Sequence, residues 1–290
     1  EIRGIDMAKL STVQAANTHR VIVFGPPKVG KTQLVGTLAS EFKLIWFDLE
    51  NGYNTLLKLP AQLQERIELI HIPDSKVFPI AVETMLKVFS GNTVQICDEH
   101  GKVGCALCKK DNKPYVEFNI NNVPDDTIVV IDSLTQYTNS AIANITRNKP
   151  DDYKMQCDDW GNLRALVEKL LSCVQSASCS IVCISHEEEV EMEDGRKKIV
   201  PVCGSSKSSR NTAKYFDHVV YCEVKNKKHI AGSSTAYSNN ILTGSRTDVT
   251  LENDEAPSLL TIFKSTGRTV AATPATNALS ALKGMVKQNG

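Results

Sequence analysis

The strongest chemical signal in the sequence is a glycine-rich segment that ends in a lysine and a threonine. Residues 25–32 read GPPKVGKT, which fits the pattern G-x-x-x-x-G-K-[S/T]. Such a loop turns backbone N–H groups toward phosphate oxygens, and the helix behind it adds partial positive charge. Lys31 would reach the β- and γ-phosphates, and the Thr32 hydroxyl would ligate Mg²⁺. The predicted nucleotide-binding residues are Gly25, Pro26, Pro27, Lys28, Val29, Gly30, Lys31, Thr32 and Gln33.

Two strand-like runs end in carboxylates, which a phosphoryl-transfer site needs besides the loop. Residues 127–132 read TIVVID, an apolar run that ends at Asp132. At the carboxyl end of a parallel strand this aspartate would face the ligand crevice and anchor the metal. Residues 45–50 read IWFDLE, so that Asp48 and Glu50 stand two positions apart. One of them could orient the attacking water, and the alternative is a pair of solvated acids.

A further apolar run is followed directly by a histidine. Residues 180–185 read SIVCIS, and His186 comes next. If this strand is parallel to the others, His186 lies at the same edge of the sheet as the glycine-rich loop. It could then sense the terminal phosphate and pass its presence to the segment that follows. The alternative is a histidine with a purely structural role, whose hydrogen bonds are satisfied at the end of the strand.

Four residues with the chemistry of metal ligands stand close together in the sequence. Cys97, His100, Cys105 and Cys108 form two pairs, each with two intervening residues. Thiolates and an imidazole in this arrangement suit tetrahedral Zn²⁺, and four protein ligands leave no open position for catalysis. The sequence therefore predicts structural zinc. Free thiols, or a redox pair made by Cys105 and Cys108, are the alternatives.

These ligands lie in a polar stretch, residues 91–122, which interrupts the alternation of strands and helices. We interpret the stretch as a zinc-binding insertion. It has too few apolar residues to form a stable core, and a bound metal can supply the missing stability. The insertion would join the core through only two chain ends. Its unfolding need not propagate into the sheet.

The elements that must position these residues indicate an α/β fold with a mostly parallel sheet. Short β-branched runs alternate with helical patterns, as in sheets covered by helices. The expected strands are residues 21–24, 44–48, 68–72, 127–132, 180–185 and 218–224. The expected helices are residues 31–41, 79–89 and 160–177. From residue 225 onward the pattern is turn-rich and predicts an antiparallel C-terminal extension.

Composition limits the classes of protein to which the chain can belong. Among 290 residues, 33 Lys and Arg balance 33 Asp and Glu, so nucleic-acid binding must come from local patches. No apolar run approaches the roughly 18 residues of a membrane span, and the N-terminal stretch lacks the apolar core of a secretory signal. The 9 cysteines lack the spacing of a small secreted protein. We therefore expect a reducing, cytoplasmic location and no membrane partner.

Taken in order, these motifs resemble the RecA-like P-loop ATPases, and most closely the phage-type Sak ATPases, which are RecA-related single-strand annealing proteins. The resemblance spans residues 21–249 through four strings: GPPKVGKT, WFDLENGYNTL, TIVVIDSLT and SIVCISH. It implies ATP as the nucleotide, Glu50 as the catalytic carboxylate and Asp132 as the second metal anchor. His186 stands where RecA usually has glutamine. A phage-encoded protein of this kind would act in the host cytoplasm.

The same resemblance implies a domain plan and a set of partners. A RecA-like ATPase domain would cover residues 21–270, between an N-terminal arm at residues 1–20 and a linker with a short helix at residues 271–290. Single-stranded DNA would be the main partner, with further copies of the chain in a homo-oligomer and a single-strand-binding protein as an additional candidate. Arg246 falls where RecA-like proteins present a cation to a neighbour's nucleotide. A solvated turn arginine is the alternative.

In RecA-like ATPases the loops after the Asp132 and His186 strands contact DNA. Here the second loop begins with a predicted hairpin that turns at Asp194 and Gly195, and a small, polar, cationic stretch follows at residues 204–214. We expect that stretch to be a mobile loop, with an ordinary surface loop as the alternative. The cations predicted to contact phosphate are Arg196, Lys197, Lys198, Lys207 and Arg210.

Two other functions are compatible with the sequence. A nucleotide-gated assembly or adaptor protein could use the zinc module to bind a protein partner. A helicase-type or packaging motor could be built on the same ATPase core. DNA-stimulated ATP hydrolysis favours recombination or annealing over the adaptor, and processive duplex unwinding favours the motor.

Overall fold

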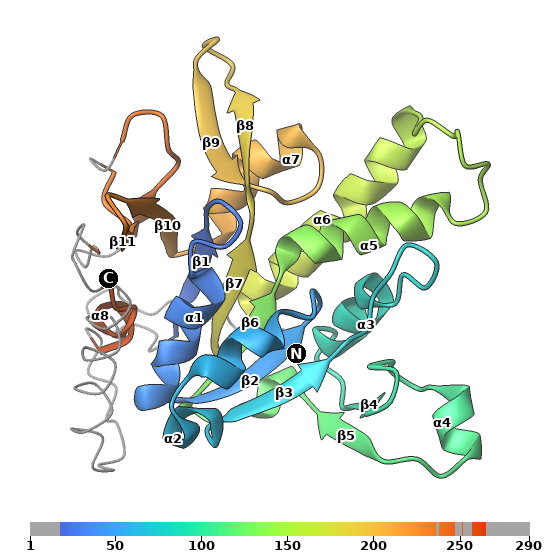
Figure 1. The fold of residues 1–290 in the computed structure, drawn as a ribbon. Helices are drawn as coiled ribbons and strands as arrows, with labels where there is room; N and C mark the ends of the chain where they lie inside the picture. The colour runs from blue at the N-terminus through green and yellow to red at the C-terminus, as the bar shows by residue number, and fades with distance from the viewer. Residues whose placement is uncertain (1–17, 236–237, 247–250, 252–256, 265–290) are drawn as a thin grey trace, which may run out of the picture.

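A mostly parallel sheet of eight strands forms the centre of the computed structural model, which describes residues 18–235, 238–246, 251 and 257–264 (Figure 1). The parallel strands are β1 (Arg20–Phe24), β2 (Lys43–Asp48), β3 (Ile67–His71), β6 (Thr127–Asp132), β7 (Ser180–Ser185) and β10 (His218–Lys225). Two antiparallel strands pair with β10, namely β11 (Lys228–Gly232) and β12 (Gly244–Ser245). The fold is thus α/β with an antiparallel C-terminal extension, as the sequence predicts.

The order of the strands decides which residues can share a site. Across the sheet the order is β11–β10–β1–β7–β6–β2–β3. Asp48 at the end of β2 is paired in register with Asp132 at the end of β6, and Phe24 at the end of β1 is paired with Ser185 at the end of β7. Because these strands are parallel, the segments that follow them all leave from one edge of the sheet.

Helices cover both faces of the sheet, because alternate residues of each buried strand point to opposite sides. Val21 and Val23 pack with one set of helices, and Ile22 and Phe24 with the other. The first set comprises α1 (Lys31–Gly36), η2 (Thr37–Ser40), η3 (Gly52–Lys58), α2 (Ala61–Gln64) and α8 (Leu260–Lys264). The second comprises α3 (Ala81–Val88), α5 (Leu134–Thr146) and α6 (Cys157–Ser176).

The insertion forms a small unit beside α3 (Figure 1). It contains the antiparallel pair β4 (Val94–Cys97) and β5 (Tyr115–Phe118), with α4 (Ala106–Lys110) between them and η4 (Ile120–Asn122) after them. Ile96 and Phe118 are buried and belong to the same apolar cluster as the sheet and α3, and Phe47 of β2 makes an edge-to-face contact with Phe118. The expectation that the insertion is tied to the core only through its chain ends is therefore wrong.

The segment after β7 forms a hairpin and then a helix. β8 (Glu187–Glu191) and β9 (Lys197–Pro201) pair antiparallel around Gly195, as predicted, and the hairpin projects from the sheet (Figure 1). The expected mobile loop at residues 204–214 is instead α7 (Ser206–Asn211) followed by η5 (Thr212–Tyr215). The Ser205 hydroxyl caps α7 by accepting a hydrogen bond from the Ser208 N–H. Serine is a strong N-cap residue, which explains a helix in so polar a sequence.

Most element predictions are confirmed to within a few residues, and α5 is the main addition. Its sequence, LTQYTNSAIANIT, mixes polar and apolar residues and includes poor helix formers. The predicted helix at residues 31–41 is divided into α1 and η2. Among the described segments no helix is long and apolar enough to cross a membrane. Residues 1–17 of the expected N-terminal arm (residues 1–20) and the terminal segment at residues 271–290 lie outside the described residues.

Candidate active site and metal-binding cluster

The glycine-rich loop, residues 25–30, links the end of β1 to the start of α1. Gly25 and Gly30 have φ angles of +149° and +89°, which side chains rarely allow. A Cβ on Gly25 would also lie 2.1 Å from the carbonyl oxygen of Cys222. The loop therefore needs glycine at this position for conformation and for space.

Of the remaining residues predicted to bind nucleotide, three face solvent and one is held from a distant strand. Pro27 and Lys28 are exposed, Gln33 is exposed on α1, and the Val29 carbonyl lies 2.9 Å from Nδ1 of His229 on β11. His229 is a contact that the sequence does not reveal, because it lies 200 residues away along the chain. It braces the loop from the neighbouring antiparallel strand.

Lys31 is only 6% exposed, at the first position of α1. Its Nζ donates hydrogen bonds to the carbonyl oxygens of Gly25 at 2.9 Å and Pro26 at 2.7 Å. Burial lowers the pKa of this ammonium, and nearby acidic groups such as Asp132 and Glu50 oppose the shift. A phosphate group that replaced the two carbonyls would give Lys31 a charged partner.

Thr32 and Asp132 meet where the predicted metal would bind. The Thr32 hydroxyl donates to Asp132 Oδ2 at 3.0 Å, and Asp132 is 2% exposed. Burial, together with the charge of Glu50, raises the pKa of Asp132 to about 7, although the Thr32 hydrogen bond opposes this. A divalent cation would compensate for the buried negative charge, and Mg²⁺ prefers oxygen ligands of these two kinds. The two side chains fit a magnesium site.

Glu50 lies in the turn after β2, facing the end of β7. One carboxylate oxygen accepts a hydrogen bond from the Ser133 hydroxyl, and the other lies 3.5 Å from Nε2 of His186. Burial raises the pKa of Glu50, but the hydrogen bonds from His186 and Ser133 and the Lys31 charge outweigh it, so the pKa is lowered overall. Glu50 is therefore ionised at neutral pH, as a residue that orients or activates water must be.

His186 is brought to Glu50 because β7 lies between β1 and β6. Its backbone N–H donates to the Thr135 hydroxyl at 2.9 Å, and its Nδ1 is buried without a hydrogen-bond partner. The next residue, Glu187, begins β8. A histidine that touches the candidate catalytic carboxylate thus connects directly to the projecting hairpin.

Two residues at this edge, Ser133 and His71, were missed by the single motifs, and they contact the two carboxylates that the sequence offers at and just after the end of β2. Ser133 bonds Glu50 and also caps α5 by accepting from the Gln136 N–H, and the string DSLT contains that cap signal. Asp48 is completely buried, and one of its oxygens lies 3.2 Å from Nδ1 of His71 on β3. His71 follows no motif, because its role depends on the pairing of β2 with β3.

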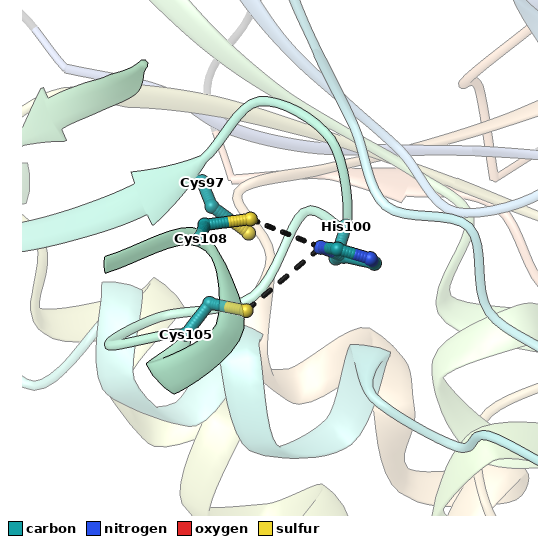
Figure 2. A group of neighbouring side chains, drawn as sticks. All are labelled: Cys97, His100, Cys105 and Cys108. Atoms are coloured by element: carbon teal, nitrogen blue, oxygen red, sulfur yellow. Dashed lines mark hydrogen bonds between the residues drawn. The ribbon is translucent and has the colours of Figure 1, made fainter. Parts of the chain in front are cut away.

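The four predicted zinc ligands converge, and we call them the Cys/His cluster (Figure 2). Their ligand atoms all lie within 4.8 Å of one another. His100 Nδ1 is 3.1 Å from the sulfur of Cys108 and 3.8 Å from that of Cys105. A sulfur and a nitrogen atom bound tetrahedrally to one Zn²⁺, at about 2.3 and 2.0 Å, stand about 3.5 Å apart, and two such sulfur atoms stand about 3.8 Å apart. The donor set fits zinc, and its atoms lie close enough together to share one ion.

The pKa shifts of the thiols in the cluster also favour binding of a cation. The backbone N–H of Cys108 lowers the pKa of Cys105, whereas burial raises the pKa of Cys108 to about 12, and the neighbouring Cys97 and Cys105 reinforce that rise. Crowded thiols cannot all ionise without a compensating charge. A metal ion would supply it.

The predicted DNA-contacting cations occupy two different settings. On the hairpin, Arg196 pairs with Asp194 at 2.7 Å and Lys197 with Glu189 at 2.7 Å. Lys198 is half-buried on β9. Lys207 is exposed and Arg210 half-buried, both on α7.

Arg246 lies at the opposite edge of the sheet from the glycine-rich loop of its own chain. It follows β12, which pairs with the beginning of β10. Its guanidinium lies 3.6 Å from a carboxylate oxygen of Asp217 and donates to the carbonyl oxygen of Lys214. A role at a neighbouring subunit's nucleotide stays a prediction.

Comparison with known proteins places the chain in a family. No curated protein matches the sequence. Among solved structures the chain is similar to a prototypical ATPase from the type III secretion system of pathogenic bacteria, with a TM-score of 0.41 and 16% identity over 71% of this chain and 52% of that chain. This chain thus spans about half the length of that protein. The family model described as "AAA domain" matches residues 17–256, which include the glycine-rich loop, both buried aspartates, Glu50 and His186. The chain belongs to this AAA-domain family and carries a P-loop ATPase domain.

Proposed function

We propose that the protein is an ATP-dependent, single-stranded-DNA-binding ATPase that acts in recombination or annealing. The observation that carries the proposal is the contact between His186 and Glu50, because it joins the hydrolytic site to the segment that bears β8, β9 and α7. The resemblance of the four motifs to Sak ATPases supports DNA as the ligand of that segment. Its exposed cation Lys207 and the partly buried Arg210 supply local positive charge in a chain of zero net charge.

In the proposed reaction each residue has a separate task. Lys31 holds the β- and γ-phosphates, while Thr32 and Asp132 hold Mg²⁺, which neutralises charge on the phosphate oxygens when bound. The ionised Glu50 orients the attacking water, and Ser133 and His186 hold its two oxygens in place. DNA bound at the hairpin or α7 would act on hydrolysis through His186.

A second candidate function is the nucleotide-gated adaptor, and the insertion favours it. Leu107 on α4 and Tyr115 on β5 are 65% and 56% exposed, next to the Cys/His cluster. Exposed apolar side chains on a metal-stabilised unit suit a protein partner. An adaptor of this kind would bind nucleotide tightly and lack affinity for DNA.

Hydrolysis provides the first test of the site. Lys31→Ala should abolish nucleotide binding or turnover, because it removes the cation nearest the phosphates. Glu50→Gln should bind ATP normally and lose turnover by about 100-fold or more, since shape is kept and the charge that orients water is lost. Lys43→Ala, at the other end of β2, is the matched control and should behave as wild type in binding and steady-state assays. Normal turnover by Glu50→Gln would assign the role to another carboxylate.

The Cys/His cluster is tested by its metal content. Purified protein should contain about one zinc per chain, and the double variant Cys105→Ser/Cys108→Ser should lose it, as elemental analysis would show. Because the insertion shares the main core, the double variant should also unfold at a lower temperature while still binding ATP. Cys157→Ser, which changes an exposed cysteine, should keep the metal. Absence of zinc from protein prepared without chelator would contradict the assignment.

DNA binding is tested by neutralising the cations of α7. The double variant Lys207→Ala/Arg210→Ala should bind single-stranded DNA more weakly, and the slope of log affinity against log salt should flatten by about 0.7 per lost phosphate contact. Basal hydrolysis should survive while stimulation by DNA falls. Lys109→Ala/Lys110→Ala on α4 is the matched double variant. A larger loss there would move the DNA surface to the insertion, and DNA that neither binds nor stimulates wild-type protein would favour the adaptor.

A further inference from the structure

Asp48 holds the turn that carries Glu50. Its Oδ1 accepts hydrogen bonds from the backbone N–H of Gly52 at 2.8 Å and of Glu50 at 3.3 Å. A Cβ on Gly52 would approach both Asp132 at 3.4 Å and Asp48 at 3.6 Å. The turn therefore passes close to the metal-binding aspartate, and the buried carboxylate of Asp48 sets the course of the backbone at Glu50.

Asp48 is held in turn from the edge strand β3. Nδ1 of His71 lies 3.2 Å from Asp48 Oδ2, and the Ile72 N–H donates to the Asp48 carbonyl oxygen at 2.9 Å. His71 also makes an edge-to-face contact with Tyr53 in η3. The backbone and side chain of Asp48 are thus both fixed by the end of β3, so a shift of residues 71–72 would be transmitted to Glu50.

The loop of the Cys/His cluster closes directly on that strand end. Gly101, which follows the ligand His100, is so close to β3 that a Cβ there would lie 2.5 Å from the His71 carbonyl oxygen and 2.7 Å from Ile72 Cα. The Gly101 N–H donates to the Cys97 carbonyl oxygen, and its own carbonyl accepts from the Thr84 hydroxyl at 3.1 Å. Gly101 is thereby fixed between the metal ligands and the end of β3.

We propose that metal binding at the Cys/His cluster sets the position of Glu50 through Gly101, His71 and Asp48, so that the metal controls hydrolysis and leaves nucleotide binding unchanged. The inference rests on the proposed roles of the cluster and of Glu50. The metal fixes His100, and the adjacent Gly101 then packs against residues 71–72 and holds them in place. Asp48, held by these residues, keeps the turn that carries Glu50 in the position needed for hydrolysis. Lys31 and Thr32 belong to β1–α1 and lie outside this chain of contacts.

Two glycines in the same loop allow a matched test. Gly101→Ala and Gly104→Ala both leave the four ligands in place, and both residues have positive φ angles, +58° and +66°. They differ in surroundings, because a Cβ at Gly104 would meet nothing within 4 Å. Gly101→Ala should keep its zinc and its nucleotide affinity but lose turnover by about tenfold or more, whereas Gly104→Ala should turn over within about twofold of wild type.

Equal turnover by the two variants, with zinc retained in both, would overturn the coupling. Glu50→Gln measured in parallel separates this failure from failure of the proposed function. If Glu50→Gln is inactive and the glycine variants match, only the coupling is wrong. If Glu50→Gln hydrolyses ATP normally, the role of Glu50 itself is wrong and the coupling fails with it.

If Gly101→Ala loses zinc or fails to fold, amide hydrogen exchange of the wild-type protein tests the coupling instead. The amides of Glu50 and Gly52 both donate to Asp48, so removal of zinc by a chelator should speed exchange in residues 48–53 by about tenfold or more. Exchange in β1 should stay the same. Unchanged exchange in residues 48–53 after zinc loss would overturn the proposal.

Discussion

The hydrogen bond from Thr32 to Asp132 is the contact on which the rest of the site depends. It joins segments 100 residues apart, the start of α1 and the end of β6. It can form because β1 and β6, with β7 between them, run parallel and end at the same edge of the sheet. The same order places His186 beside Glu50 and next to the hairpin. One sheet topology thus brings together the phosphate loop, the predicted metal anchor and the residue that leads toward the proposed DNA-binding segment.

Crowded ionisable groups occur at two places in the molecule, and a cation would relieve both. At the sheet edge the charges of Glu50 and Asp48 add to burial in raising the pKa of Asp132. At the Cys/His cluster, burial and neighbouring thiols raise the pKa of Cys108. Such arrangements are costly in the absence of a compensating charge, and they are typical of sites organised around a bound ion. The two sites communicate, in the proposed account, through the end of β3.

Local patterns predicted the six parallel strands, the phosphate loop and all four members of the Cys/His cluster, but not β4 and β5 of the insertion. These features are encoded in short stretches, such as an apolar run that ends in Asp132. The partners of Glu50 and Asp48 were not predictable in this way, because Ser133 and His71 reach them through strand pairing. The helix α7 was missed because its stability depends on a serine cap in a polar sequence. The packing of Phe118 against Phe47 was missed because an insertion with few apolar residues is expected to fold separately from the main core.

In the proposed site, Thr32 and Asp132 form the metal-binding half of the nucleotide pocket. The most direct measurement is the affinity of a non-hydrolysable ATP analogue, determined by calorimetry with Mg²⁺ and with a chelator, for wild type and for Asp132→Asn. Mg²⁺ should tighten binding to wild type. Asp132→Asn should lose most of this gain, whereas its metal-free affinity should not fall, because Lys31 and the loop are intact. An undiminished gain from Mg²⁺ in Asp132→Asn would show that Asp132 does not hold the metal.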